Sequence, residues 1–203
     1  MAVIWLVLVG IAAFAVASVA CGLWLRSHPT KANAERTSRL LHFLFFALLN
    51  LLPLAVFISP GIFNLDAVTG LPPLTPRAAW AALGAVLAVP GVYLLTVTNK
   101  ALRALGSGAN AFRLTQNVVT STVYERTRNP MSLGFYLWVV AVGLLFGSTT
   151  FTLIALFGVV PSHVVFLRVF EEVELPLRLG DSYRAYQART PFLLPVGRPT
   201  RAS

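Results

Sequence analysis

The stretch that decides the fold reads LGFYLWVVAVGLLF at residues 133–146, then GSTT at 147–150, then FTLIALFGVVPSHVVFL at 151–167. Neither apolar run contains a charged side chain, and only four small residues separate the two runs. Apolar runs of about this length are typical of helices that enter a lipid bilayer. Four residues suffice for a tight turn between antiparallel helices, so we predict a helical hairpin whose tip barely leaves the membrane.

Three further apolar segments precede the hairpin, at residues 2–25, 40–59 and 78–97. The chain of 203 residues is 57% hydrophobic and only 11% charged, whereas soluble domains carry about 25% charged residues. We therefore predict an all-α integral membrane bundle of about five transmembrane helices. The sequence contains no internal repeat, and we expect a single domain over residues 1–203.

The basic residues predict how the bundle lies in the membrane. The formal net charge is +9, and fifteen of the sixteen Lys and Arg residues fall in residues 26–39, 98–130 and 168–203. With five spans these three stretches share one side, so the positive-inside rule predicts an outer N-terminus and a cytoplasmic C-terminus. This distribution explains the basic charge without a nucleic acid partner. The single cysteine, Cys21, excludes an intrachain disulfide and a cysteine-based zinc site, and no metal site is expected.

The first group of informative polar residues precedes the fourth span. Asn129 is followed by Pro130, which is a favoured first residue of a helix, so we predict that the helix starts there and that Asn129 caps it. The free N–H groups of this helix, with Arg128 beside them, would form a site for a carboxylate or phosphate. An ordinary capped span, with Arg128 reaching lipid phosphates, is the alternative.

The second group follows the fifth span and contains Glu171, Glu172 and Glu174, three of the seven acidic residues of the chain. Adjacent carboxylates at a membrane boundary repel each other and lose solvation, so they favour a cationic partner. That partner is either a ligand ammonium or sulfonium group, or an arginine of the chain itself, Arg128 or Arg168. The charges alone leave both interpretations open.

The residues after these glutamates indicate two short helices. Pro176 lacks the N–H that would bond the carbonyl of Glu172, which predicts a kink, and Gly180 is suited to end the helix. Asp181 would cap the next helix, and Tyr183 and Tyr186 would share one of its faces. 

A histidine within the fifth span, His163, lies two turns before the glutamates. It is either a partner in a hydrogen bond between helices or part of the same site.

Taken together, the two groups resemble the isoprenylcysteine carboxyl methyltransferase family and its relatives, the phospholipid N-methyltransferases. The family pattern is a segment LVTxGxYxxxR(H/N)PxYxG, a helical hairpin, and then EE…L…FG…Y…Y…VPRxxP. The matching residues are Val119, Thr120, Tyr124, Arg128, Asn129, Pro130, Met131, Gly134, Glu171, Glu172, Leu175, Leu179, Gly180, Tyr183, Tyr186, Pro191 and Pro195. The resemblance covers about residues 117–195 and extends weakly from residue 106.

The resemblance implies a methyltransferase that depends on S-adenosylmethionine, with the cofactor bound in residues 98–203 and a lipophilic or lipid acceptor arriving from the membrane lipids. Arg128 would hold the cofactor carboxylate, and Glu171 or Glu172 its ammonium group or ribose hydroxyls. The aromatic rings of Tyr183, Tyr186 and Phe192 would flank the adenine. Arg128 and Glu172 are the expected catalytic residues. Thr120, Tyr124, Asn129, Gly134 and His163 complete the expected cofactor site.

Three departures from the family pattern concern mainly the acceptor: the glycine before the tyrosine is Thr122, the tyrosine of PxYxG is Ser132, and the arginine of VPRxxP is Phe192. They leave the acceptor open among a carboxylate, thiol, amine or phenol. They also favour an alternative, a non-catalytic membrane scaffold or lipid-binding relative. A second alternative, an NADPH-dependent sterol-type reductase, would favour an Arg-Asp pair in place of Glu171-Glu172.

Overall fold

The fold was analysed in a computed structural model that describes residues 2–52, 65–106, 114–120 and 122–195. All the regular elements in these ranges are helices, which confirms the predicted fold class. The N-terminal half contains α1 (Ala2–Ser27), α2 (Lys31–Leu44), the π-helical turn η1 (Phe45–Leu51), the short α4 (Leu65–Thr69) and α5 (Arg77–Leu105). The 3-10 turn η3 (Thr122–Glu125) and α6 (Pro130–Phe146) follow.

One long helical rod, interrupted by two π-helical turns, forms the second arm of the hairpin and continues beyond it. It consists of α7 (Thr149–Ile154), η4 (Ala155–Val159), α8 (Val160–Val165), η5 (Phe166–Glu171) and α9 (Glu172–Leu179). A last helix, α10 (Asp181–Arg189), turns away from its end.

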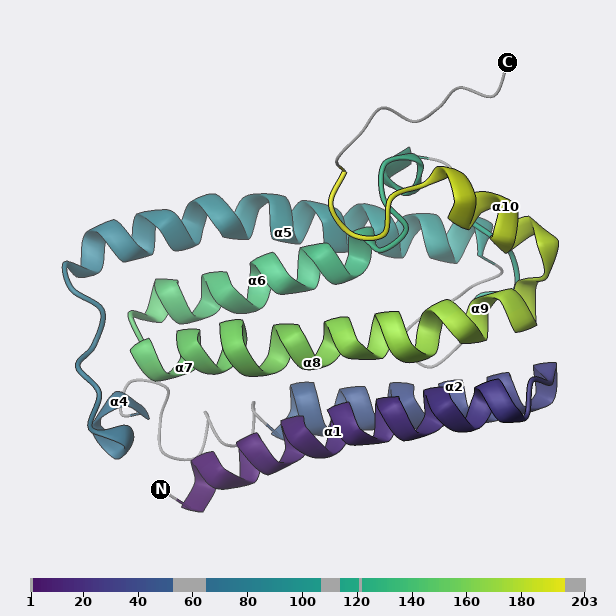
Figure 1. The fold of residues 1–203 in the computed structure, drawn as a ribbon. Helices are drawn as coiled ribbons and strands as arrows, with labels where there is room; N and C mark the ends of the chain where they lie inside the picture. The colour runs from purple at the N-terminus through teal and green to yellow at the C-terminus, as the bar shows by residue number, and fades with distance from the viewer. Residues whose placement is uncertain (1, 53–64, 107–113, 121, 196–203) are drawn as a thin grey trace.

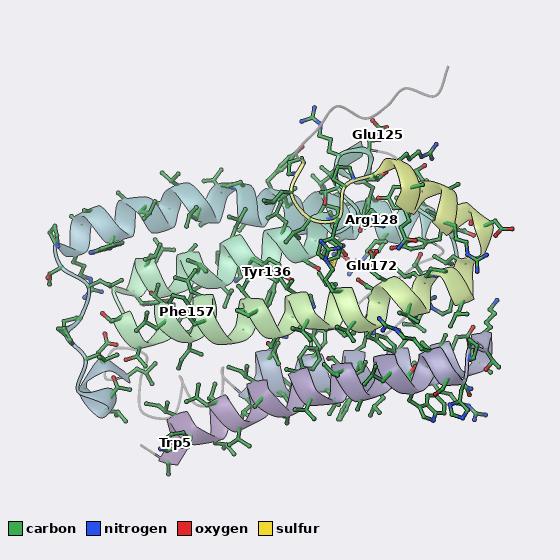
Figure 2. All side chains as sticks on the ribbon, viewed as in Figure 1. Trp5, Glu125, Arg128, Tyr136, Phe157 and Glu172 are labelled. Carbon is green, nitrogen blue, oxygen red and sulfur yellow. The ribbon has the colours of Figure 1, made fainter. Side chains whose placement is uncertain are left out.

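Three helices are long and apolar enough to cross a bilayer, namely Ile4–Ser27, Arg77–Leu105 and Thr149–Leu179, and α6 is a shorter apolar helix. Large apolar side chains cover the outside of the bundle: Trp5 and Phe157, both labelled in Figure 2, are 61% and 75% exposed. Such exposure is costly in water but suits a lipid-facing surface. Of the predicted second span, residues 40–52 are helical, and residues 53–59 lie outside the described residues.

The hairpin is confirmed, with its turn reduced to two residues. Gly147 ends α6 in the left-handed conformation at φ 67°, which a residue without a Cβ adopts readily. Ser148 then caps α7, because its hydroxyl accepts a hydrogen bond from the Phe151 N–H at 3.2 Å. The two arms are therefore reversed within one tight turn.

A carboxylate from α4 holds this tip. Asp66 is buried, and its oxygens accept hydrogen bonds from the Ser148 hydroxyl at 3.1 Å, the Thr149 N–H at 3.1 Å and the Thr150 N–H at 2.7 Å. It thereby satisfies the free N–H groups at the start of α7. The connection between the second and third predicted spans is in this way fastened to the hairpin.

The helices lie side by side, with the rod of α7–α9 between α6 on one side and α1 and α2 on the other (Figure 1). Helices α5 and α6 approach closely, because a Cβ on Gly134 would lie 3.0 Å from the carbonyl oxygen of Gly91. Small residues at such crossings are typical of membrane helices. The described parts of the three basic stretches lie toward the end of the bundle where α9 and α10 lie, opposite the hairpin tip (Figure 1).

Candidate functional site

The C-terminal segment is fastened over the start of α6. The Arg128 N–H donates to the carbonyl of Pro191 at 2.9 Å, and the Thr127 hydroxyl donates to the carbonyl of Leu193 at 2.8 Å. From α10, the Tyr186 hydroxyl donates to the carbonyl of Tyr124 at 2.7 Å. These contacts bring together the two groups of polar residues that lie on either side of the hairpin in the sequence.

Helix α6 begins at Pro130, as predicted, but the prediction that the Asn129 side chain caps it is wrong. The Asn129 amide instead donates to the carbonyl of Phe192 at 2.9 Å and makes no cap hydrogen bond. The C-terminal segment supplies an acceptor that competes for this side chain. The first N–H groups of a helix have no partner within it, so those of α6 are left without a side-chain cap.

Arg128 and Glu172 form an ion pair, with Nη1 and Oε2 3.1 Å apart and 8% and 15% of their side chains exposed. Figure 2 shows the two side chains meeting between the start of α6 and the start of α9. The Gln187 amide of α10 also donates to Oε2 of Glu172, at 2.6 Å. Of the two interpretations of the glutamates, pairing with Arg128 therefore holds for Glu172. The Nε–H of Arg128 is buried and makes no hydrogen bond with the described residues.

A second buried ion pair joins Glu174 to Arg178, one turn later on α9. The Arg178 Nη1 also donates to the carbonyl of Thr115 at 2.7 Å, which holds the loop before η3 against α9. Arg178 is not among the predicted site residues, although its spacing of four from a glutamate indicates a helical ion pair. The pair neutralises the third glutamate of the group.

Glu171 differs from its neighbours because no described residue forms a hydrogen bond or ion pair with its carboxylate. The π-helical turn η5 bonds residues five apart, so it places Glu171 one turn after Phe166 on the same side of the rod. Wide turns of this kind often occur at functional sites. Glu171 is therefore the acidic side chain in the group that is open to a ligand.

The tyrosines of α10 share one face, as predicted, with the rings of Tyr183 and Tyr186 6.0 Å apart. Gly180 ends α9, as expected, but Asp181 does not cap α10. Gly180 occupies the cap position, and Asp181 lies in the first turn and pairs with Arg184 at 3.1 Å. Burial raises the pKa of Tyr183, Tyr186 and Tyr124 well above the usual value, so all three stay protonated at neutral pH. Nearby arginines oppose this shift at Tyr186 but do not cancel it.

His163 forms the hydrogen bond between helices that the sequence offered as one interpretation. Its Nδ1 lies 2.9 Å from the hydroxyl of Tyr136 on α6. Aromatic rings surround it, among them Phe45 at 4.6 Å and Phe166 at 5.4 Å between ring centroids. His163 thus lies in apolar surroundings, away from the ion pairs.

One cavity of about 490 Å³ joins these features, a size typical of small-molecule sites. Its polar half lies at the basic end of the bundle and is lined by Thr115, Asn117, Tyr124, Arg128, Asn129, Met131, Ser132, Glu171, Glu174, Arg178, Tyr183 and Tyr186. Its aromatic half lies deeper in the bundle and is lined by His42, Phe45, Phe46, Leu95, Phe135, His163, Phe166 and Leu167. The cavity is therefore charged at one end and aromatic at the other.

Comparison with known families agrees with this geometry. Residues 79–176 match the model of the phospholipid methyltransferase family, which confirms the predicted resemblance. This domain belongs to the phospholipid methyltransferase family. No curated protein and no solved structure matches the chain significantly. The apolar helices and the family match support an integral membrane protein, and the matched residues 79–176 include Arg128 and the three glutamates.

Seven of the ten predicted site residues line this cavity: Tyr124, Arg128, Asn129, His163, Glu171, Tyr183 and Tyr186. The other three lie elsewhere. Thr120 is exposed on the loop, and Gly134 packs against Gly91. Glu172 lies behind Arg128 and holds it.

The departures from the family pattern also have defined positions. Ser132 lines the cavity, whereas Phe192 does not. The ring of Phe192 instead lies under Arg168, whose guanidinium carbon is 3.6 Å from the ring centroid, a cation–π contact. Arg168 therefore does not pair with the glutamates, and the expected contact between Phe192 and an adenine has no support in this geometry.

Proposed function

We propose that the protein transfers a methyl group from S-adenosylmethionine to a lipophilic acceptor at the cytoplasmic face of the membrane. The observation that carries the proposal is the pairing of charges in the cavity. Four charged side chains around its polar end form two ion pairs, Arg128 with Glu172 and Arg178 with Glu174. Among the described residues, two groups remain for a ligand: the Nε–H of Arg128 and the carboxylate of Glu171. When bound, the cofactor would supply an electrophilic methyl group on a sulfonium ion.

The anionic part of the cofactor would bind at Arg128 and the start of α6. The Nε–H of Arg128 is a buried donor without a partner among the described residues, and the N-terminus of α6 starts two residues later. Guanidinium groups and helix N-termini both bind carboxylates well. Arg128 with the first N–H groups of α6 would therefore hold the carboxylate of the methionine part.

The cationic part of the cofactor would bind Glu171 rather than Glu172. Glu172 already neutralises Arg128, whereas Glu171 lines the cavity without a hydrogen-bonded or ion-paired partner among the described residues. A buried carboxylate without a partner is unfavourable, and a ligand ammonium or sulfonium group would remove that cost. We assign Glu171 to the positive charge and Glu172 to the positioning of Arg128.

The adenine of the cofactor and the apolar acceptor would contact the remaining walls of the cavity. Tyr124, Tyr183 and Tyr186 keep neutral hydroxyls, and their aromatic rings lie beside the charged groups. An adenine could pack against such rings. The aromatic half of the cavity, deeper in the bundle, suits the apolar acceptor. The acceptor and the methyl group would meet between these two halves, where alignment is the main requirement for transfer.

The test is calorimetric titration of the purified protein in detergent with S-adenosylhomocysteine, S-adenosylmethionine and NADPH. We expect both adenosyl ligands to bind and NADPH not to bind. Arg128→Ala and Glu171→Gln should each weaken binding of S-adenosylhomocysteine at least tenfold, equivalent to about 1.4 kcal/mol.

The matched control is Asp181→Asn, which removes an exposed charge outside the cavity and should leave the affinity unchanged. A folded protein that binds no adenosyl ligand overturns the proposal and favours a non-catalytic scaffold. Binding of NADPH alone favours a reductase.

A further inference from the structure

The aromatic half of the cavity contains a histidine that the functional proposal does not use. His42 belongs to α2, which precedes the matched family domain, and it lines the cavity together with residues of α6 and the α7–α9 rod. Its ring meets the edge of Phe166 with centroids 6.0 Å apart. Phe166 is one π-helical turn from Glu171, so His42 lies where the charged half meets the aromatic half.

A hydrogen bond at Nδ1 of His42 determines which nitrogen of the neutral imidazole carries the hydrogen. Nδ1 of His42 lies 2.8 Å from the carbonyl oxygen of Ser38. A carbonyl only accepts, so Nδ1 carries the hydrogen, and in the neutral ring Nε2 presents a lone pair. Nε2 forms no hydrogen bond with any described residue. His42 thus offers an oriented proton acceptor at the boundary of the two halves.

The charges around His42 indicate what kind of methyl acceptor would bind beside it. From α9, the charge of Arg178 acts on His42, and the ion pair with Glu174 neutralises that charge; from α8, His163 lies close enough to interact with it. Arg128 and Arg178 are the cationic side chains among the described lining residues, and each is already in an ion pair. The aromatic half therefore has no free cation for a phosphate or a carboxylate, and its rings favour a planar, uncharged group.

We propose that His42 is the proton acceptor for a neutral phenolic hydroxyl on a lipophilic acceptor bound among Phe45, Phe135 and Phe166; this rests on the proposed function. In the step, the oxygen–methyl bond forms as the methyl–sulfur bond of the sulfonium breaks. The bonding pair stays on sulfur, which becomes a neutral thioether. The phenolic proton passes to Nε2 of His42 and then to water at the polar end. The products are an aryl methyl ether, S-adenosylhomocysteine and one proton.

Two variants separate this role from a structural one. His42→Asn keeps a donor close to the position of Nδ1 for the Ser38 carbonyl but removes the base at Nε2. His28→Asn is the matched control, because His28 is exposed and does not line the cavity. Both variants are expected to bind S-adenosylhomocysteine within twofold of the original protein.

The first measurement follows methylation of a long-chain 4-alkylphenol, with a fatty acid and a phosphatidylethanolamine of similar chain length as alternative acceptors. We expect transfer to the alkylphenol, at least a hundredfold loss of kcat in His42→Asn, and no loss in His28→Asn. The second measurement needs no turnover: an alkyl-substituted 4-nitrophenol is bound with S-adenosylhomocysteine, and its absorbance reports ionisation. In His42→Asn the ionisation should move to higher pH, while Glu174, Arg178 and His163 stay in place.

Unchanged kcat and unchanged ionisation in His42→Asn, with normal binding of S-adenosylhomocysteine, overturn the role of His42 and leave the proposed function standing. Methylation of the fatty acid or the phospholipid but not of the alkylphenol overturns the acceptor class. Loss of S-adenosylhomocysteine binding in the original protein overturns the functional proposal itself.

Discussion

Arg128 on the loop before α6 and Glu172 at the start of α9 hold each other at 3.1 Å, so one ion pair connects the two polar groups that flank the hairpin. Both side chains are largely buried, and Gln187 of α10 bonds the same carboxylate. The pair leaves the Nε–H of Arg128 without a partner among the described residues. Glu172 therefore serves the cavity indirectly, by fixing the direction in which Arg128 presents its free donor.

The first prediction follows from this arrangement. Glu172→Gln leaves the buried guanidinium uncompensated, and removing one partner of a buried pair costs roughly 3–5 kcal/mol of stability. We expect a lower free energy of unfolding in detergent and weaker binding of S-adenosylhomocysteine. In a double-mutant cycle, Arg128→Gln with Glu172→Gln should destabilise less than the sum of the single variants. Additive effects would show that the two side chains do not act as a pair.

A second prediction uses two ion pairs of the same spacing. Glu174 and Arg178 are 1% and 5% exposed, whereas Glu35 and Arg39 on α2 are 30% and 67% exposed. Burial makes the first pair costly to break, so Glu174→Gln should cost roughly 3–5 kcal/mol, measured by chemical unfolding in detergent. Glu35→Gln, the matched control, should cost only about 0.5 kcal/mol or less. Equal losses would contradict the importance of burial.

The sequence predicted what depends on local patterns. The two apolar runs and the glycine between them indicated the hairpin, and Pro130 marked the start of α6, because these signals act over a few residues. The same holds for Gly180 and for the shared face of Tyr183 and Tyr186. The charge balance also indicated that the glutamates needed cations, which Arg128 and Arg178 supply.

What the sequence could not predict depends on contacts between distant segments. The Asn129 amide donates to the carbonyl of Phe192 and therefore does not cap α6. Glu172 rather than Glu171 contacts Arg128, because a π-helical turn shifts the register of the rod. His42 reaches the cavity from α2, far from both motifs in the sequence. No local pattern reports such pairings.

Gly134 yields a third prediction, about packing rather than ligand binding. A Cβ at this position would lie 3.0 Å from the backbone oxygen of Gly91 and 2.9 Å from the Cβ of Leu94, so Gly134→Ala must push α5 and α6 apart. Overpacking of this kind costs about 1–3 kcal/mol. We expect a lower unfolding temperature with little change in the affinity for S-adenosylhomocysteine. A large loss of affinity without loss of stability would instead place Gly134 in the ligand site.

A fourth prediction concerns the opposite end of the bundle. Asp66→Ala removes three hydrogen bonds from the start of α7, and losing a cap costs about 0.5–2 kcal/mol. The variant should unfold at a lower temperature and bind S-adenosylhomocysteine normally, because neither Asp66 nor the residues of the hairpin tip line the cavity. Impaired binding would mean that the hairpin tip and the cavity are coupled.

The last prediction is a loss of stability at alkaline pH. Burial raises the pKa of Tyr183 and Tyr186 in the folded protein above the value of about 10 found in unfolded chains. The folded state therefore holds these protons more tightly, and the resulting stability is complete below pH 10 and is lost as the pH rises further. Each tyrosine should contribute up to about 1.4 kcal/mol per pH unit in that window. Thermal unfolding in detergent from pH 8 to 11 should show this decline, and Tyr183→Phe should make it shallower. An unchanged slope in that variant would mean that Tyr183 is as easily ionised in the folded protein as in the unfolded chain.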